Sequence, residues 1–145
     1  MYQHYVSSIN YRNGAFASLA ALHTASSPSY SAHLYDRATQ MRLNSKEAWL
    51  GRGALAQDGG ELEVAASHLS RALGLDPLCW RVGINIGNLA ARQGNLTTAL
   101  RAFSHVIRTN PFIPQAFYSR GFVQVINAPL PYLSASFGFL RNILQ

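Results

Sequence analysis

Residues 46–77 read KEAWLGRGALAQDGGELEVAASHLSRALGLDP, and residues 80–111 read WRVGINIGNLAARQGNLTTALRAFSHVIRTNP. The second stretch repeats the first after 34 residues, with residues of the same size class at matched positions. The matched pairs are Gly53 and Gly87, Gly60 and Gly94, Ala65 and Ala99, Leu69 and Phe103, and Pro77 and Pro111. A period of this length is typical of repeat proteins, in which each unit buries its apolar face only against its neighbours.

The small and large residues of each unit recur at helical spacing. Trp49, Gly53 and Ala56 share one face of a helix, and Ala65 and Leu69 share a face of the next. Glycine and alanine let two helices approach closely where they cross, and a bulky residue fills the space beside them. Each unit is therefore predicted to be a pair of antiparallel helices.

Glycine and proline mark where these helices end. Gly60 and Gly94 follow the first helix of each unit, and glycine accepts the positive φ angle that often ends a helix. Pro77 and Pro111 follow the second helix, which proline cannot continue. Asn95 begins a formal glycosylation sequon, yet its place at a helix start predicts an N-cap.

The repeated residues resemble the tetratricopeptide repeat family. The resemblance implies an all-α fold, a tetratricopeptide-type α-solenoid of antiparallel helix pairs wound into a right-handed superhelix of about three to four repeats. We predict a flanking segment at 1–12, a degenerate repeat at 13–45, repeats at 46–79 and 80–113, and a degenerate final repeat with a C-terminal capping helix at 114–145.

Some positions depart from the family pattern. Leu19 stands one period before Gly53, where the pattern has glycine. Gly83 stands one period after Trp49 and replaces its aromatic ring, and Val106 replaces a small residue. The pattern is strong over residues 46–111, good again over 117–121, and weaker on both flanks.

The resemblance also implies a function. Similar proteins are scaffolds, which bind a peptide or partner helix in a concave groove lined by the first helix of each repeat. The groove positions carried over to this chain are Leu50, Ala54, Gln57, Arg81, Ile84, Asn85, Asn88, Arg92, Gln115, Tyr118, Ser119 and Phe122. This apolar and amide-rich surface suits a ligand with apolar anchors and a carboxylate. Ordinary packing between repeats, or solvated surface, remains the alternative for each residue.

Two further expectations concern the partner. The carboxylate-clamp modules that bind acidic chaperone tails need two lysines, two asparagines and an arginine, and this chain has only Asn85 at a clamp position. The partner should therefore be recognised mainly through apolar contacts. An apolar C-terminal interface, which suggests a small subunit or assembly factor of a larger complex, is predicted at Tyr132, Phe137, Phe139 and Leu140.

The charge pattern offers an alternative function. The formal net charge is +6, and no acid follows Asp76. A basic surface could contact nucleic acid or an anionic membrane. The arginines available are Arg81, Arg92, Arg101, Arg108, Arg120 and Arg141. Their spacing forms no single basic stripe, so we rank this reading second.

Composition and motifs narrow the remaining classes. Apolar residues make up 48% of the chain, which disfavours disorder, and a single cysteine excludes an internal disulfide framework. The single cysteine also leads us to expect an intracellular protein. We expect that it is not an enzyme and binds no metal or cofactor, because no two histidines lie four residues apart and no phosphate loop or nucleophile elbow is present. The uncharged segment 121–140 contains two prolines, which argues against a membrane span.

Overall fold

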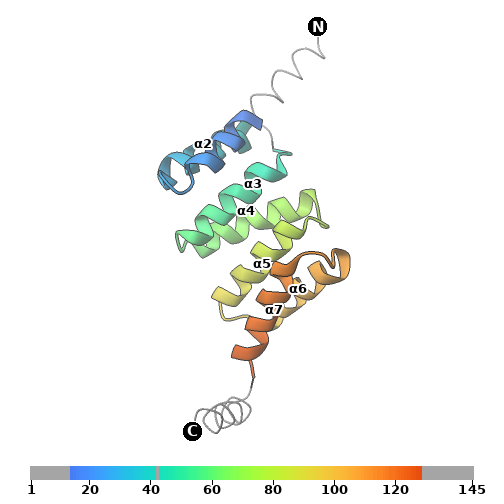
Figure 1. Ribbon diagram of the computed structural model, residues 1–145. Helices are drawn as coiled ribbons and strands as arrows, with labels where there is room; N and C mark the ends of the chain where they lie inside the picture. Colours follow the sequence, from blue (N-terminus) through green and yellow to red (C-terminus); the bar gives the residue numbers. More distant parts are fainter. Residues whose placement is uncertain (1–13, 42, 129–145) are drawn as a thin grey trace.

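The computed structural model describes residues 14–41 and 43–128 of the chain. These residues form seven helices and no strand. Residues 14–23 are helical, and they are followed by α2 (Pro28–Met41), α3 (Lys46–Asp58), α4 (Leu62–Leu75), α5 (Trp80–Arg92), α6 (Leu96–Thr109) and α7 (Pro114–Ile126). The helices stack in sequence order from one end of the molecule to the other (Figure 1). The described chain is thus an all-α solenoid, as the sequence predicts.

The turns inside the two central helix pairs have the same geometry. Gly60 has a φ angle of +82° and Gly94 has one of +78°, which confirms the left-handed turn residues predicted from sequence. After α3, the Gly60 N–H donates to the Gln57 carbonyl at 3.1 Å and the Glu61 N–H donates to the Ala56 carbonyl at 2.8 Å. This pair of bonds is the Schellman motif, which satisfies carbonyls left open at a helix end.

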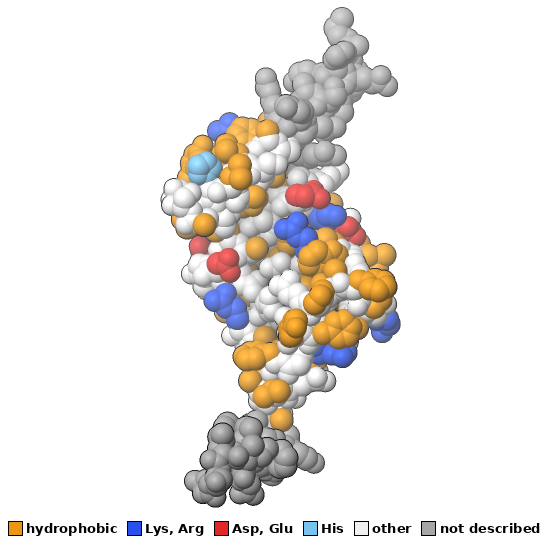
Figure 2. Space-filling model, viewed as in Figure 1, with side chains coloured by type: hydrophobic (Ala, Val, Ile, Leu, Met, Phe, Trp, Pro, Cys, Tyr) orange, Lys and Arg blue, Asp and Glu red, His pale blue; other side chains and the backbone are white. Residues whose placement is uncertain are grey.

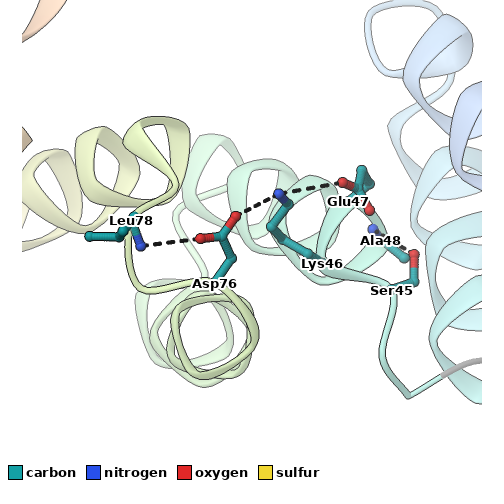
Figure 3. Close-up of polar contacts among 6 residues, drawn as sticks. All are labelled: Ser45, Lys46, Glu47, Ala48, Asp76 and Leu78. Carbon is teal, nitrogen blue, oxygen red and sulfur yellow. Dashed lines mark hydrogen bonds and ion pairs between the residues drawn. The ribbon is translucent and has the colours of Figure 1, made fainter. Parts of the chain in front are cut away.

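Polar caps begin α3 and α6. Asn95 Oδ1 accepts a hydrogen bond from the Thr98 N–H at 3.1 Å, which confirms the predicted N-cap of α6. Ser45 caps α3 in the same way, accepting from the Ala48 N–H at 3.4 Å (Figure 3). Each cap satisfies one of the N–H groups that a helix start leaves without a partner.

A charged link joins the start of α3 to the turn that follows α4. Lys46 Nζ lies 2.8 Å from Asp76 Oδ2 and 3.7 Å from Glu47 Oε1, and Asp76 Oδ1 accepts from the Leu78 N–H (Figure 3). The hydrogen bond from Lys46 lowers the pKa of the Asp76 carboxyl below its ordinary value. Because the pair is largely solvated, it fixes the turn more than it stabilises the fold.

The helices of each central pair cross at a glycine. A Cβ atom added at Gly53 would lie 2.8 Å from Leu69 Cγ, and one added at Gly87 would lie 2.4 Å from Phe103 Cε1. Both bulky residues are fully buried. The structure therefore confirms that glycine permits the close approach and that Leu69 or Phe103 fills the space beside it.

The core is continuous from one helix pair to the next. Leu69 and Ala72 of α4 share a buried cluster with Val82 and Leu89 of α5. A second cluster joins Phe103 of α6 to residues of α5 and α7. Each pair therefore buries its second face only when the next pair is stacked on it, which is how a solenoid gains stability.

The first described helix pair, residues 14–23 and α2, packs on α3 through a contact unlike the glycine crossings of the central pairs. Tyr35, which lies one period before Leu69, is buried and approaches Gly51 of α3, where an added Cβ would lie 2.3 Å from its ring. Burial raises the pKa of the Tyr35 hydroxyl. Arg52 Nε donates to Asp36 Oδ1 at 2.9 Å and also ties α3 to α2. Leu19 occupies the position that is glycine in the central repeats. The close approach therefore lies between α2 and α3, where Tyr35 meets Gly51 of the next repeat.

Candidate functional site

The first helices of successive pairs line one surface. α3 contacts α5, and α5 contacts α7. Between these helices lies an open depression with a volume of about 490 Å³. Its lining residues are Gln57, Asn88, Ala91, Arg92, Phe103, Tyr118, Ser119, Phe122 and Val123. We call this depression the groove. Six of its residues, Gln57, Asn88, Arg92, Tyr118, Ser119 and Phe122, are among those placed there from sequence.

The apolar wall of the groove comes from α7. Tyr118 and Phe122 lie four residues apart on one face of the helix, and their exposed fractions are 79% and 67%. Phe103 and Val123, both buried, contribute to the lining beneath them. Two exposed aromatic residues one helical turn apart offer a contiguous apolar patch to water, which is typical of partner-binding surfaces.

The polar wall comes from α3 and α5. The guanidinium of Arg92 donates to the backbone carbonyl of Gln57, so it is held at the groove beside α3. Gln57 is only 5% exposed, and its side-chain oxygen Oε1 has no hydrogen-bond partner among the described residues. That oxygen is itself buried, so a ligand in the groove does not reach it unless the Gln57 side chain moves.

Other residues assigned to the groove from sequence lie elsewhere. Leu50 and Ile84 are 5% and 3% exposed and belong to the two central cores, so they are packing residues and offer no accessible surface. The Asn85 side chain donates to the Arg81 carbonyl at 2.8 Å within its own helix. The remaining predicted positions that do not line the depression are Ala54, Arg81 and Gln115.

Three lining residues were not assigned to the groove from sequence: Ala91, Phe103 and Val123. Phe103 was assigned only to the crossing with Gly87, which it also makes. Its ring is large enough to fill the crossing and still reach the groove. Nothing in the repeat pattern indicates this second contact.

The predicted C-terminal interface, formed by Tyr132, Phe137, Phe139 and Leu140, lies outside the described residues. Near the end of α7, Val125 and Ile126 are exposed. The apolar surface of α7 therefore extends beyond the groove toward the end of the described chain.

The surface around α5 to α7 is basic. Residues 77–128 contain five arginines and no acid. Within the described part of the chain, these arginines form no ion pair. In Figure 2 the red side chains lie no lower than the middle of the molecule, and only blue charged side chains are visible below them. An acidic group on a ligand would therefore be attracted to the α5 to α7 side of the groove, whereas Asp58, next to Gln57, lies at its α3 side.

Groups with other chemistry are scattered. Burial lowers the pKa of the His68 imidazole, and nearby Arg52 lowers it further. Across residues 14–41 and 43–128, no three metal-ligating side chains cluster. No described helix has both the length and the apolar character needed to cross a bilayer.

Part of the sequence matches a known family, and the fold is similar to that of several solved structures. The tetratricopeptide repeat family model matches residues 25–78. No curated protein sequence matches the chain. The fold is similar to a Thermobaculum terrenum O-GlcNAc transferase mutant, with a TM-score of 0.77 and 22% identity over 80% of this chain. This chain spans only 22% of the length of that transferase chain.

Two other solved structures are similar. The first TPR of Spaghetti (RPAP3), bound to the HSP90 peptide SRMEEVD, has a TM-score of 0.75 and 12% identity, covering 81% of this chain and 94% of its own. YrrB, described as a TPR protein with an unusual peptide-binding site, has a TM-score of 0.69 and 22% identity, covering 76% of this chain and 57% of its own. At these identities the likeness concerns the fold. The tetratricopeptide repeat match thus covers residues 25–78, and the described chain shares its all-α solenoid fold with these solved structures.

Proposed function

We propose that the chain is a non-catalytic scaffold that binds a segment of a partner protein in the groove between α3, α5 and α7. The observation that carries this proposal is the groove itself, with a volume of about 490 Å³. It sets the exposed rings of Tyr118 and Phe122 opposite Arg92.

The groove defines the chemistry of the ligand. An apolar side chain would pack on Tyr118 and Phe122, because aromatic surfaces provide most of the binding energy at such sites. A carboxylate would pair with Arg92. The ligand is therefore an extended or helical segment with an apolar anchor beside an acid.

Two structural relatives support a peptide ligand, since one holds an HSP90 peptide and the other is described by its peptide-binding site. Recognition here would differ from a carboxylate clamp. Leu50, Ala54, Gln115 and Ser119 stand at positions where a clamp needs lysine, asparagine or arginine. We therefore propose a ligand that carries one acidic group and binds mainly through apolar contacts. We also propose that the partner belongs to a larger complex, of which this chain is a small subunit or assembly factor.

The test begins with a phage-displayed library of random peptides selected on the full chain. We expect enrichment of peptides that combine an aromatic or aliphatic anchor with Asp or Glu. The best synthetic peptide is then titrated by fluorescence anisotropy. Phe122→Ala and Arg92→Glu should each weaken binding by about tenfold or more.

The matched controls are Phe112→Ala and Arg108→Glu. Phe112 is 88% exposed but does not line the groove, and Arg108 lies on α6. Equal losses from the groove and control variants would contradict the proposal. The alternative function, contact with nucleic acid or an anionic membrane, is tested with a single-stranded oligonucleotide and anionic vesicles. It would take precedence if these bind with a steep salt dependence while no peptide binds.

A further inference from the structure

A ring pair fills the outer side of the α3/α4 helix pair. The rings of Trp49 and His68 lie 5.3 Å apart between centroids, with their planes tilted by 31°. Trp49 Nε1 also donates to the Leu43 carbonyl at 2.8 Å. The indole is therefore held by an aromatic neighbour on one side and by a backbone acceptor at its polar edge.

The next helix pair lacks both rings. The residues 34 positions after Trp49, His68 and Leu43 are Gly83, Ala102 and Pro77. All three line a cavity with a volume of about 370 Å³. We call this cavity the α5/α6 socket. Its size is in the range of ligand pockets, roughly 300–1,000 Å³.

Val106 explains the shape of the socket. An added Cβ at Gly83 would lie 2.4 Å from Val106 Cγ2, so Val106 takes the inner part of the space left by the missing ring. The equivalent residue in the preceding pair is Ala72, which leaves room for Trp49. The outer part of the space stays open and has apolar walls, which include Leu73, Trp80 and Ile86. Apolar walls without contact partners lose dispersion energy that an inserted side chain would restore.

The rim of the socket is positively charged. Arg101 lines it and is exposed, and His105 beside it lies 3.3 Å from the Arg108 guanidinium. Asp76, next to the socket residue Pro77, is already paired with Lys46, and residues 77–128 contain no further acid. An acidic residue next to the inserted side chain would be attracted to the rim.

We propose that the α5/α6 socket is a second docking site, which takes a tryptophan side chain flanked by acidic residues on a partner protein. The chain itself shows the occupant, because Trp49 fills the equivalent space one repeat earlier. The indole N–H would find its acceptor in the carbonyl of Pro77, which corresponds to that of Leu43. The socket shares no lining residue with the groove, so the two sites are separate.

The experiment titrates the isotope-labelled full chain with acetyl-Glu-Trp-Glu-amide and follows amide shifts by NMR. We expect saturable shifts at Gly83, Ile86 and Ala102. Acetyl-Glu-Ala-Glu-amide should give no saturable shift, because it lacks the indole. Acetyl-Lys-Trp-Lys-amide should bind about threefold or more weakly, because its charge matches that of the rim.

Variants locate the site. Gly83→Trp combined with Val106→Ala recreates the packing of the α3/α4 pair and fills the socket, so binding should weaken by about tenfold. Val106→Ala alone is the control and should keep binding. Ala102→Met narrows the socket from α6 and gives the same test if the double variant fails to fold. Arg101→Glu should weaken binding about threefold, whereas Arg120→Glu, outside the socket, should not.

Several results would overturn the proposal. These are equal shifts with the alanine peptide, undiminished binding to the Ala102→Met variant, or shifts confined to other surfaces. Concentration-dependent line broadening in the absence of peptide would instead identify a second copy of the chain as the occupant. Phe122→Ala should leave binding of the tryptophan peptide unchanged, so that failure of this proposal and failure of the groove proposal can be told apart.

Discussion

Replacement of Gly87 by alanine tests the close approach of α5 and α6. The added Cβ would lie 2.4, 2.6 and 2.8 Å from three atoms of the Phe103 ring. The ring is rigid and fully buried, so it cannot move aside into solvent. Overpacking of this kind costs about 1–3 kcal/mol, and the upper part of that range applies here. Alanine regains about 1 kcal/mol through its higher helix propensity. The free energy of unfolding should therefore fall by about 1–2 kcal/mol.

Gly74→Ala is the matched control. Gly74 is exposed in α4, and an added Cβ there would meet nothing within 4 Å. This substitution should stabilise the chain by about 0.5–1 kcal/mol. The two variants should thus differ by about 1.5–3 kcal/mol, although the chemical change is identical. Urea unfolding followed by circular dichroism measures both.

A second substitution tests the mechanism. Phe103→Leu recreates the Gly53 and Leu69 pair of the preceding repeat, with a smaller and more flexible side chain. It should cost about 1 kcal/mol in the parent chain but little or nothing in the Gly87→Ala background. The reasoning would be refuted if Gly87→Ala were as stable as Gly74→Ala, or if Phe103→Leu cost the same in both backgrounds.

Three other predictions follow from the structure. Asn95→Ala should lower the free energy of unfolding by about 1 kcal/mol in urea unfolding, because it removes the N-cap of α6, whereas Glu61→Ala, where no side-chain cap bond exists, should cost less. The pKa of His68 is lowered by burial, so below its ordinary value of 6.5 the unfolded chain binds more protons than the folded one. Stability should therefore fall between pH 7 and pH 5, and His68→Gln should flatten that dependence in pH-dependent thermal melts. Arg52→Ala should cost about 1 kcal/mol or less in the same melts, because its pair with Asp36 is partly solvated.

The helix pairs were predictable because their signals are local. Gly60 and Gly94 adopt positive φ angles that other residues rarely accept, and this preference depends only on the backbone. Asn95 caps the helix that it begins, three residues from its donor. The 34-residue period then aligned one pair with the next. The boundaries predicted for the flanking segment and the repeats, at 1–12, 13–45, 46–79, 80–113 and 114–145, stay predictions.

The groove was predictable only in part. Repeat alignment brought Asn88, Arg92, Tyr118 and Phe122 to one surface, and the structure places them together. The same alignment put Leu50 on that surface, where the structure buries it. Helical periodicity fixes the face of a helix to within about one residue, and that error separates a core position from an accessible one.

The sequence by itself determined the class of fold, the helix pairs, their turns and caps, and the glycine crossings, because each depends on residues close together along the chain or exactly one period apart. Only the tertiary structure decided how one pair is rotated on the next. That rotation sets Tyr35 against Gly51, exposes Phe122 and buries Ile84. It arises from side-chain packing between pairs, which is the sum of many small contacts and has no signature at any single position.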